Sequence, residues 1–234
     1  MPHHTPLIVA LDFPSFEDTL LFVNQLDPKT VKLKIGLQLF VTVGPSIVET
    51  LQKMGFGIFL DLKFHDIPNQ VKNACLAAAG LGVDLITVHA ENGAECITLA
   101  KQALSALQQP PKLLAVTVLT SVSPENLKQQ NITTSIEALV VHRAQLALSA
   151  GADGVVASSL ETPILRQHFG QDPIIVTPGI RMAEDVSHDQ ARVATPEQAV
   201  ASGSTYIVVG RPITQSPTPK KVIDTILQRL SMKG

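Results

Sequence analysis

Short apolar runs rich in β-branched residues recur along the chain, and segments with a helical pattern of apolar positions separate them. Within each run the apolar residues follow one another with little polar alternation, as in strands that are buried on both faces of a parallel sheet. The runs predict eight strands: Leu7–Leu11, Val31–Ile35, Gly57–Leu62, Leu85–His89, Leu113–Val118, Gly154–Ala157, Ile174–Thr177 and Tyr206–Gly210.

The segments between these runs predict helices at 15–26, 45–54, 68–82, 93–107, 136–151 and 195–203. Ser15 begins the first of them and Asp18 follows three residues later, which is typical of a capped helix N-terminus. Glycine closes several of the segments, as the C-terminus of a helix prefers.

Eight strands that alternate with helices in a chain of 234 residues favour a (β/α)8 barrel. A doubly wound open sheet is the main alternative, because the periodicity of the elements does not distinguish the two. The chain has no linker, low-complexity segment or block of like charges. We therefore expect residues 1–234 to form a single barrel domain.

Composition narrows the class of protein. Hydrophobic residues make up 45% of the chain and charged residues 16%, which supports a sizeable core. A formal net charge of -2 argues against general nucleic-acid binding. The N-terminal apolar run is too short to span a membrane, and no basic segment precedes it. Cys75 and Cys96 lack metal-ligand spacing and are expected to be buried, reduced thiols of a cytoplasmic protein.

Charged residues gather at the predicted strand ends. The stretch "FLDLKFHDIP" places Asp61, Lys63, His65 and Asp66 directly after an apolar run. Because the carboxyl ends of barrel strands face the site, we expect such side chains to converge there. The other charges assigned to strand ends are Asp12 after the first strand, Lys32 and Lys34 in the second, and Arg211 after the last. Clustered charges of opposite sign hold one another ionised and can be desolvated together.

The segment "VVGRP" suggests an anion site after the last strand. Gly210 allows the backbone to approach a ligand closely, and Arg211 offers a planar fork to phosphate oxygens. Barrels often bind phosphate at the loops after strands seven and eight. The chain contains no HExxH, Walker loop, GxGxxG or Cys-His cluster, so it indicates neither a metal nor a nucleotide cofactor.

The order of the motifs "ALDF", "KLKIG", "DLKFHDIPN", "VTVLTS", "TPGIR", "DQARVATPEQA" and "VVGRPI" resembles the orotidine 5'-phosphate decarboxylase family, most closely its bacterial branch. The resemblance covers nearly the whole chain. It implies a (β/α)8 barrel that binds orotidine 5'-phosphate as substrate and works as a homodimer with two shared active sites. It also implies that the enzyme needs neither a metal nor an organic cofactor.

The resemblance further implies a role for particular residues. An alternating array of Lys34, Asp61, Lys63 and Asp66 is expected to be catalytic, with Lys63 protonating C6 of the pyrimidine. Asp66 and Ile67 are expected to reach the partner subunit's site. From its place in the stretch alone, and apart from the resemblance, His65 is expected to support their loop. The remaining implied substrate contacts are Asp12 and Lys34 to ribose, Thr120 and Ser121 to the pyrimidine edge, Gln190 bridging phosphate and base, and Arg181, Gly210 and Arg211 to phosphate. Phosphate binding is expected to close a loop at Gly179–Thr195 over the site.

One position departs from the family pattern. Many relatives carry Thr after the "DIPN"-like stretch, where it contacts ribose across the interface, whereas this chain has Gln70. A Gln side chain still donates and accepts hydrogen bonds, so we expect Gln70 to remain a substrate contact.

Two alternatives stay open from the residues alone. A metal-dependent barrel acting on a phosphorylated sugar acid also uses an Asp-x-Lys-x-x-Asp pattern, which "DLKFHD" satisfies. Such a barrel needs a further acidic ligand near the third strand, where this chain has Phe59. The other alternative is a nucleotide-binding barrel without activity, against which the complete Asp/Lys array argues.

Overall fold

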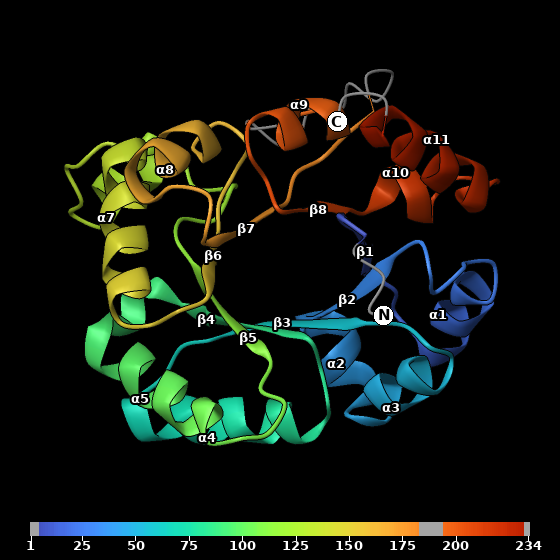
Figure 1. The fold of residues 1–234 in the computed structure, drawn as a ribbon, viewed down its shortest axis with the longest axis horizontal. Helices are drawn as coiled ribbons and strands as arrows, with labels where there is room; N and C mark the ends of the chain where they lie inside the picture. Colours follow the sequence, from blue (N-terminus) through green and yellow to red (C-terminus); the bar gives the residue numbers. More distant parts are fainter. Residues whose placement is uncertain (1–4, 183–193, 232–234) are drawn as a thin grey trace.

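Eight parallel strands close into a barrel in the computed structural model, which describes residues 5–182 and 194–231 (Figure 1). Each strand pairs with the next one along the chain, and β8 pairs with β1 through Ile8↔Val208 and Val9↔Val209. This closing pair excludes the open doubly wound sheet. The strands are β1 (Leu7–Leu11), β2 (Lys32–Gly36), β3 (Ile58–Phe64), β4 (Leu85–His89), β5 (Lys112–Val116), β6 (Gly154–Val156), β7 (Ile174–Thr177) and β8 (Tyr206–Val209).

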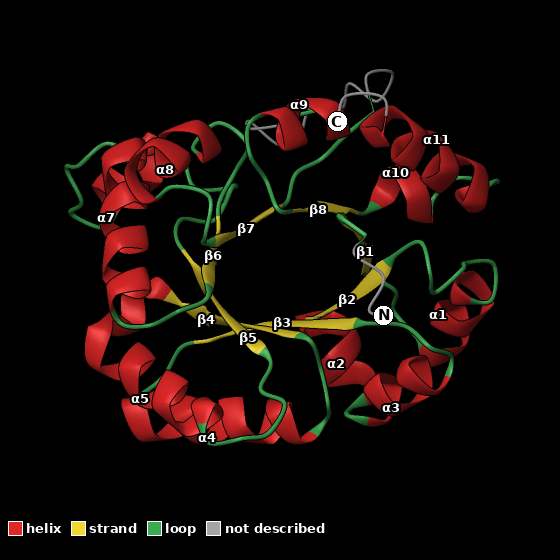
Figure 2. Cartoon of the chain, in the orientation of Figure 1, coloured by secondary structure: helices red, strands yellow, loops and turns green. Residues whose placement is uncertain are grey.

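Helices form a ring outside the barrel (Figure 2). Those that match the predicted segments are α1 (Phe16–Val23), α3 (Ser46–Lys53), α4 (Pro68–Gly80), α5 (Gly93–Ser105), α7 (Ile136–Ser149) and α9 (Pro196–Ala201). The others are α2 (Leu37–Val43), the short 3-10 helix η1 (Ala90–Asn92), α6 (Pro124–Gln129), α8 (Thr162–Phe169), α10 (Arg211–Thr214) and α11 (Pro219–Ser231).

The strand predictions are confirmed to within two residues at each end, because the β-branched runs coincide with the buried barrel wall. The unpredicted helices are mostly one or two turns long, too short for a 3.6-residue period to stand out. The exception is α11, whose Ile223 and Ile226 lie buried on one face. Ser15 caps α1 as expected, since its side chain accepts a hydrogen bond from the Asp18 N–H.

Alternate residues of each strand build two separate layers of core. The barrel interior is filled by one cluster that includes Ile8, Phe59 and Leu114. Leu7 and Val9, on the opposite face of β1, belong to the larger cluster that includes residues of the helices. The side chains that fill the barrel interior leave polar residues to its two ends, which is where any site must lie.

The two cysteines belong to the layer between strands and helices. Cys75 and Cys96 are both buried free thiols, as predicted. Burial raises the pKa of Cys75 to about 12, so this thiol stays protonated at neutral pH. Within residues 5–182 and 194–231, every helix is too short or too polar to span a lipid bilayer.

Lys32 corrects one of the strand-end assignments. It is the first residue of β2, so it lies at the amino ends of the strands, and its Nζ pairs with Asp84 Oδ2 at 3.0 Å. Asp84 immediately precedes β4. Lys34 lies two residues further along β2, toward the carboxyl ends. Strand alternation puts both lysines on the same face, but their heights in the barrel differ by about 6–7 Å.

Candidate active site

Four charged side chains meet at the carboxyl ends of β1, β2 and β3, and we call them the strand-end array: Asp12, Lys34, Asp61 and Lys63. Lys34 Nζ lies 3.6 Å from Asp12 Oδ1 and 3.6 Å from Asp61 Oδ2. Lys63 Nζ donates a hydrogen bond to the same Asp61 oxygen at 2.8 Å. Gly36 leaves room for the Lys34–Asp12 pair, since a Cβ at this position would lie 3.2 Å from Lys34 Nζ and 3.5 Å from Asp12 Oδ1.

Asp61 is the centre of the array. Its residue is 7% exposed, and one carboxylate oxygen faces both ammonium groups. The other oxygen accepts a hydrogen bond from the Thr87 hydroxyl of β4 at 3.0 Å. A buried carboxylate is costly unless it is paired and hydrogen-bonded, and here both oxygens are satisfied. The two ammonium groups are thereby held on one side of a fixed negative charge.

A cavity of about 210 Å³ opens beside the array. Lys34, Asp61 and Lys63 supply its charged lining, and Thr120 is a further polar residue in its wall. The rest of the lining is apolar: Phe59, Val116, Val118, Leu119, Val156, Ala157, Val176, Pro178 and Val208. Apolar walls with a few convergent polar groups are typical of small-molecule sites, and they strengthen the electrostatic effect of the lysines.

Lys63 owes its position to an irregularity in β3. The β3–β4 register shifts between Leu60 and Phe64, and Lys63 takes a left-handed backbone conformation with φ 51°. Left-handed conformations are costly for a residue with a side chain and cluster at functional sites. The Lys63 N–H is satisfied by the Thr87 hydroxyl at 2.9 Å instead of by a ladder partner.

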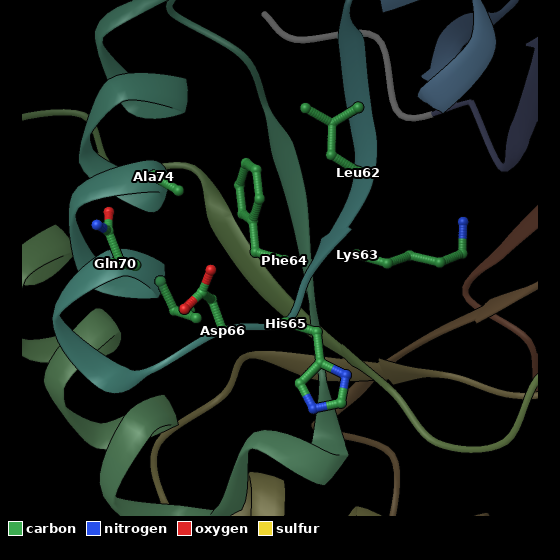
Figure 3. Close-up of a pocket in the computed structure, with 8 residues that line it drawn as sticks. Leu62, Lys63, Phe64, His65, Asp66, Gln70 and Ala74 are labelled. Carbon is green, nitrogen blue, oxygen red and sulfur yellow. The ribbon is translucent and has the colours of Figure 1, made fainter. Parts of the chain in front are cut away.

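Asp66 and Gln70 lie on the other side of this loop (Figure 3). The Lys63 side chain extends away from α4, whereas Asp66 precedes this helix and Gln70 lies in its first turn (Figure 3). Asp66 and Gln70 line a second, open cavity of about 360 Å³, whose lining also includes Lys63. Asp66 Oδ1 accepts from the Ile67 N–H at 2.6 Å, and Ile67 is 64% exposed. Within the described part of one chain, Asp66 therefore does not join the other three predicted catalytic residues.

The predicted phosphate residues follow β8 and β7. Gly210 comes directly after β8, whose Val208 lines the cavity, and Arg211 is exposed at the start of the short helix α10. Arg181 follows β7, and its backbone N–H donates to Ala194 O at 3.0 Å. Ser121, next to Thr120, is exposed. Gln190 and most of the predicted closing loop lie outside the described residues.

A possible metal-ligand group lies apart from the array. The ligand atoms of His65, His89 and Glu91 lie within 4.8 Å of one another, and the two rings stack at 5.3 Å between centroids. Burial lowers the pKa of His89. Glu91 is already paired with the Arg143 guanidinium, so its charge is matched without a metal. Phe59, which lies where the metal-dependent alternative would need an acidic ligand, is buried in the cavity wall.

Thr87 is the residue that sequence reasoning missed. It is fully buried in β4, touches both Asp61 and Lys63, and belongs to none of the predicted motifs. A Thr inside an apolar β-branched run is typical of any strand, so the sequence carries no signal for its contacts.

Fold and site together define a (β/α)8 barrel protein with a charged, partly apolar pocket at the carboxyl ends of its strands, which is where barrel enzymes place their chemistry. Comparison with known proteins narrows this class. The model of the "Orotidine 5'-phosphate decarboxylase / HUMPS family" matches residues 5–226. The chain belongs to this family.

Individual relatives agree over almost the full length of both chains. The chain is 50% identical to the orotidine 5'-phosphate decarboxylase of Teredinibacter turnerae over 213 residues, 91% of this chain and 92% of the relative. It is 46% identical to the Escherichia fergusonii enzyme of the same name, covering 98% and 94%. The crystal structure of orotidine 5'-phosphate decarboxylase from Lactobacillus acidophilus superposes with a TM-score of 0.87 at 41% identity, covering 97% and 99%.

Proposed function

We propose that this protein is a cofactor-independent carboxy-lyase that converts orotidine 5'-phosphate to UMP and CO2 in pyrimidine biosynthesis. The observation that carries the proposal is the strand-end array, which sets Lys63 Nζ against Asp61 at 2.8 Å beside a largely apolar cavity. Membership of the family, with near full-length relatives that carry this name, supports the substrate.

The chemistry needs a positioned proton donor. When the bond between C6 and the carboxylate carbon breaks, CO2 leaves and the electron pair stays on C6 in an orbital outside the ring's conjugation. A fixed ammonium beside C6 stabilises this developing charge, and its N–H proton then forms the new C6–H bond. Lys63 performs this step, because its ammonium borders the cavity.

The other members of the array orient the Lys63 ammonium and bind the substrate's ribose. Asp61 holds the Lys63 and Lys34 ammonium groups on one carboxylate oxygen and lies beside the substrate's carboxylate. Lys34 and Asp12, which are 3.6 Å apart, bind the ribose hydroxyls. The array is assembled before substrate arrives, so little reorganisation is needed during the reaction.

Phosphate and base are recognised at the loops after the later strands. Arg211 and the Gly210 backbone bind the phosphate, with Arg181 approaching from the loop after β7 and Gln190 bridging phosphate and base. Thr120 and Ser121 contact the pyrimidine edge. Binding energy from a phosphate that is remote from C6 serves to hold the ring against Lys63.

The protein acts as a homodimer in which each subunit completes the other's site. Asp66 and Ile67 enter the partner's pyrimidine pocket, and Gln70 contacts the partner's ribose. The support is geometric: Asp66 lies on the opposite side of its loop from Lys63 (Figure 3), and the apolar residue Ile67 is 64% exposed.

Loss of substrate absorbance on mixing purified protein with orotidine 5'-phosphate tests the function. We expect turnover that continues unchanged in EDTA. Sensitivity to EDTA would instead favour the metal-dependent reading. A folded dimer that binds UMP but never turns over the substrate would contradict the proposal and favour the binding-only reading.

A further inference from the structure

Thr87 makes two hydrogen bonds that join the array to the backbone of β3. Its hydroxyl donates to Asp61 Oδ1 at 3.0 Å and accepts from the Lys63 N–H at 2.9 Å. The residue is 0% exposed, so its own hydroxyl is shielded from solvent. One side chain thus fixes the carboxylate that holds the Lys63 ammonium and the peptide from which that ammonium extends.

The second bond compensates for a break in the sheet. β3 takes four residues to advance from Leu60 to Phe64, while β4 takes two, from Ile86 to Val88. Thr87 is the β4 residue that lies opposite this irregularity. Lys63 has no β4 partner in the register there, and a shielded N–H without a partner is costly. The Thr87 hydroxyl supplies the acceptor.

The left-handed conformation of Lys63 depends on such support. A left-handed residue with a side chain is strained relative to the right-handed form, because its Cβ crowds the following carbonyl oxygen. Such strain persists only where the surrounding structure over-determines it. At Lys63 the φ of 51° directs the side chain to Asp61, and Thr87 holds both ends of that pair.

We propose that Thr87 is a positioning residue, which acts on the reaction by fixing Lys63 and Asp61 relative to each other without touching the substrate. This inference rests on the proposed decarboxylation. Thr87 is absent from the cavity lining, whereas Asp61 and Lys63 both belong to it. Its hydroxyl should therefore affect the chemical step and leave nucleotide binding nearly unchanged.

The test compares Thr87→Val, Thr87→Ala and Thr87→Ser. Removing the hydroxyl in the first two should lower kcat about 100-fold, because loss of about 1 Å in positioning has effects of that size. KM should stay close to its original value. Thr87→Ser keeps the hydroxyl and should restore kcat to within about threefold. Equal losses in Thr87→Val and Thr87→Ser, or an unchanged kcat in Thr87→Ala, would overturn the proposal.

Thr5 provides a matched control. Its hydroxyl also donates one bond, to Thr30 O at 2.6 Å, and accepts one, from the Leu7 N–H at 3.3 Å. It precedes β1, at the opposite end of the barrel from the array. Thr5→Val should lose stability comparably in a denaturant titration and keep its kcat. A fall in kcat as large as that of Thr87→Val would assign the effect to the loss of any buried hydroxyl and overturn the proposal.

A crystal structure separates this inference from the proposed function. If the wild-type protein fails to turn over orotidine 5'-phosphate, the proposed function is wrong, but the geometry of Thr87→Val still tests the positioning. We expect Lys63 to leave its left-handed conformation or its Nζ to leave Asp61. A variant that keeps φ near 51° and the 2.8 Å contact would overturn the inference, whatever the substrate.

Discussion

Each end of the barrel holds lysines paired with a partly buried aspartate, and the two clusters differ in what else surrounds them. At the amino ends of the strands, Asp153 accepts hydrogen bonds from Lys101 Nζ at 2.5 Å and Lys112 Nζ at 3.4 Å, and we call these three residues the Asp153 cluster. Asp153 also accepts from the Leu113 backbone N–H at 2.9 Å, which ties it to β5. The strand-end array instead borders a cavity of about 210 Å³.

The difference shows how to distinguish a structural charge cluster from a functional one in a barrel. The Asp153 carboxylate accepts a hydrogen bond directly from the backbone N–H of Leu113 in β5. The hydrogen bonds to the Asp61 carboxylate come from side chains, and the lysines that it holds line the cavity. A cluster of charges alone therefore does not identify an active site, whereas a cluster that lines a cavity at the carboxyl ends of the strands indicates one. Substitutions in the two clusters test whether they differ in this way.

A large fall in kcat is expected from Asp61→Asn, which removes the charge and keeps the shape of the side chain. Loss of one preorganised electrostatic group typically costs about 100- to 1,000-fold in kcat. Turnover of orotidine 5'-phosphate under saturating conditions measures it, with a thermal unfolding curve as the control for folding. A variant with normal kcat would remove Asp61 from the catalytic machinery.

The next prediction concerns activity that is restored when two inactive variants share a dimer. Asp66→Asn subunits and Lys63→Ala subunits should each be nearly inactive alone. In an equal, random mixture the hybrid dimers contain one site with both residues intact, so about a quarter of wild-type activity should return. Activity of mixed, refolded subunits measures this. Should the mixture stay as inactive as its components, Asp66 does not serve the partner's site.

Asp153→Asn should act on stability and spare turnover. Burial alone raises the pKa of Asp153, but hydrogen bonds from Lys101 and the Leu113 N–H and the nearby lysine charges outweigh it, so the pKa lies below its ordinary value. A carboxylate with a lowered folded-state pKa stabilises the fold above its unfolded pKa, and this stabilisation is lost as pH falls. We expect a loss of about 2 kcal/mol at pH 7.

Urea titrations at two pH values check this prediction. The difference in unfolding free energy between wild type and Asp153→Asn should be full at pH 7 and should shrink below about pH 4, where the unfolded aspartate protonates. A difference that stays constant with pH, or a large loss of kcat, would contradict a purely structural Asp153 cluster.

The smallest effect is expected at Gln70. Gln70→Thr restores the residue that many relatives carry and should change kcat/KM by less than about threefold, because both side chains donate and accept hydrogen bonds. Gln70→Ala, which removes them, should cost about fivefold. If both variants match the wild type, Gln70 makes no contact with substrate.

The sequence predicted the barrel and most of the array, for reasons visible in particular residues. Buried β-branched runs locate the strands, and the motif around Asp61 and Lys63 locates the charge pair. The end of the barrel at which a residue lies was harder to predict, because Lys32 and Lys34 share a face of β2 and differ only in their position along the strand. Thr87 was invisible, because its contacts arise from a register shift in the neighbouring strand. The direction of Asp66 likewise depends on how the loop turns after Lys63 (Figure 3).

The role of Lys63 as proton donor is tested most directly by comparing it with Lys101. Lys63 Nζ donates to Asp61 at 2.8 Å, and Lys101 Nζ donates to Asp153 at 2.5 Å. The kcat of Lys63→Ala and Lys101→Ala on orotidine 5'-phosphate is the quantity to measure, with both proteins confirmed as folded. We expect Lys63→Ala to lose at least about 1,000-fold, as for a missing proton donor in a preorganised site, and Lys101→Ala to keep wild-type kcat. Near-normal turnover by Lys63→Ala would show that Lys63 is not the proton donor.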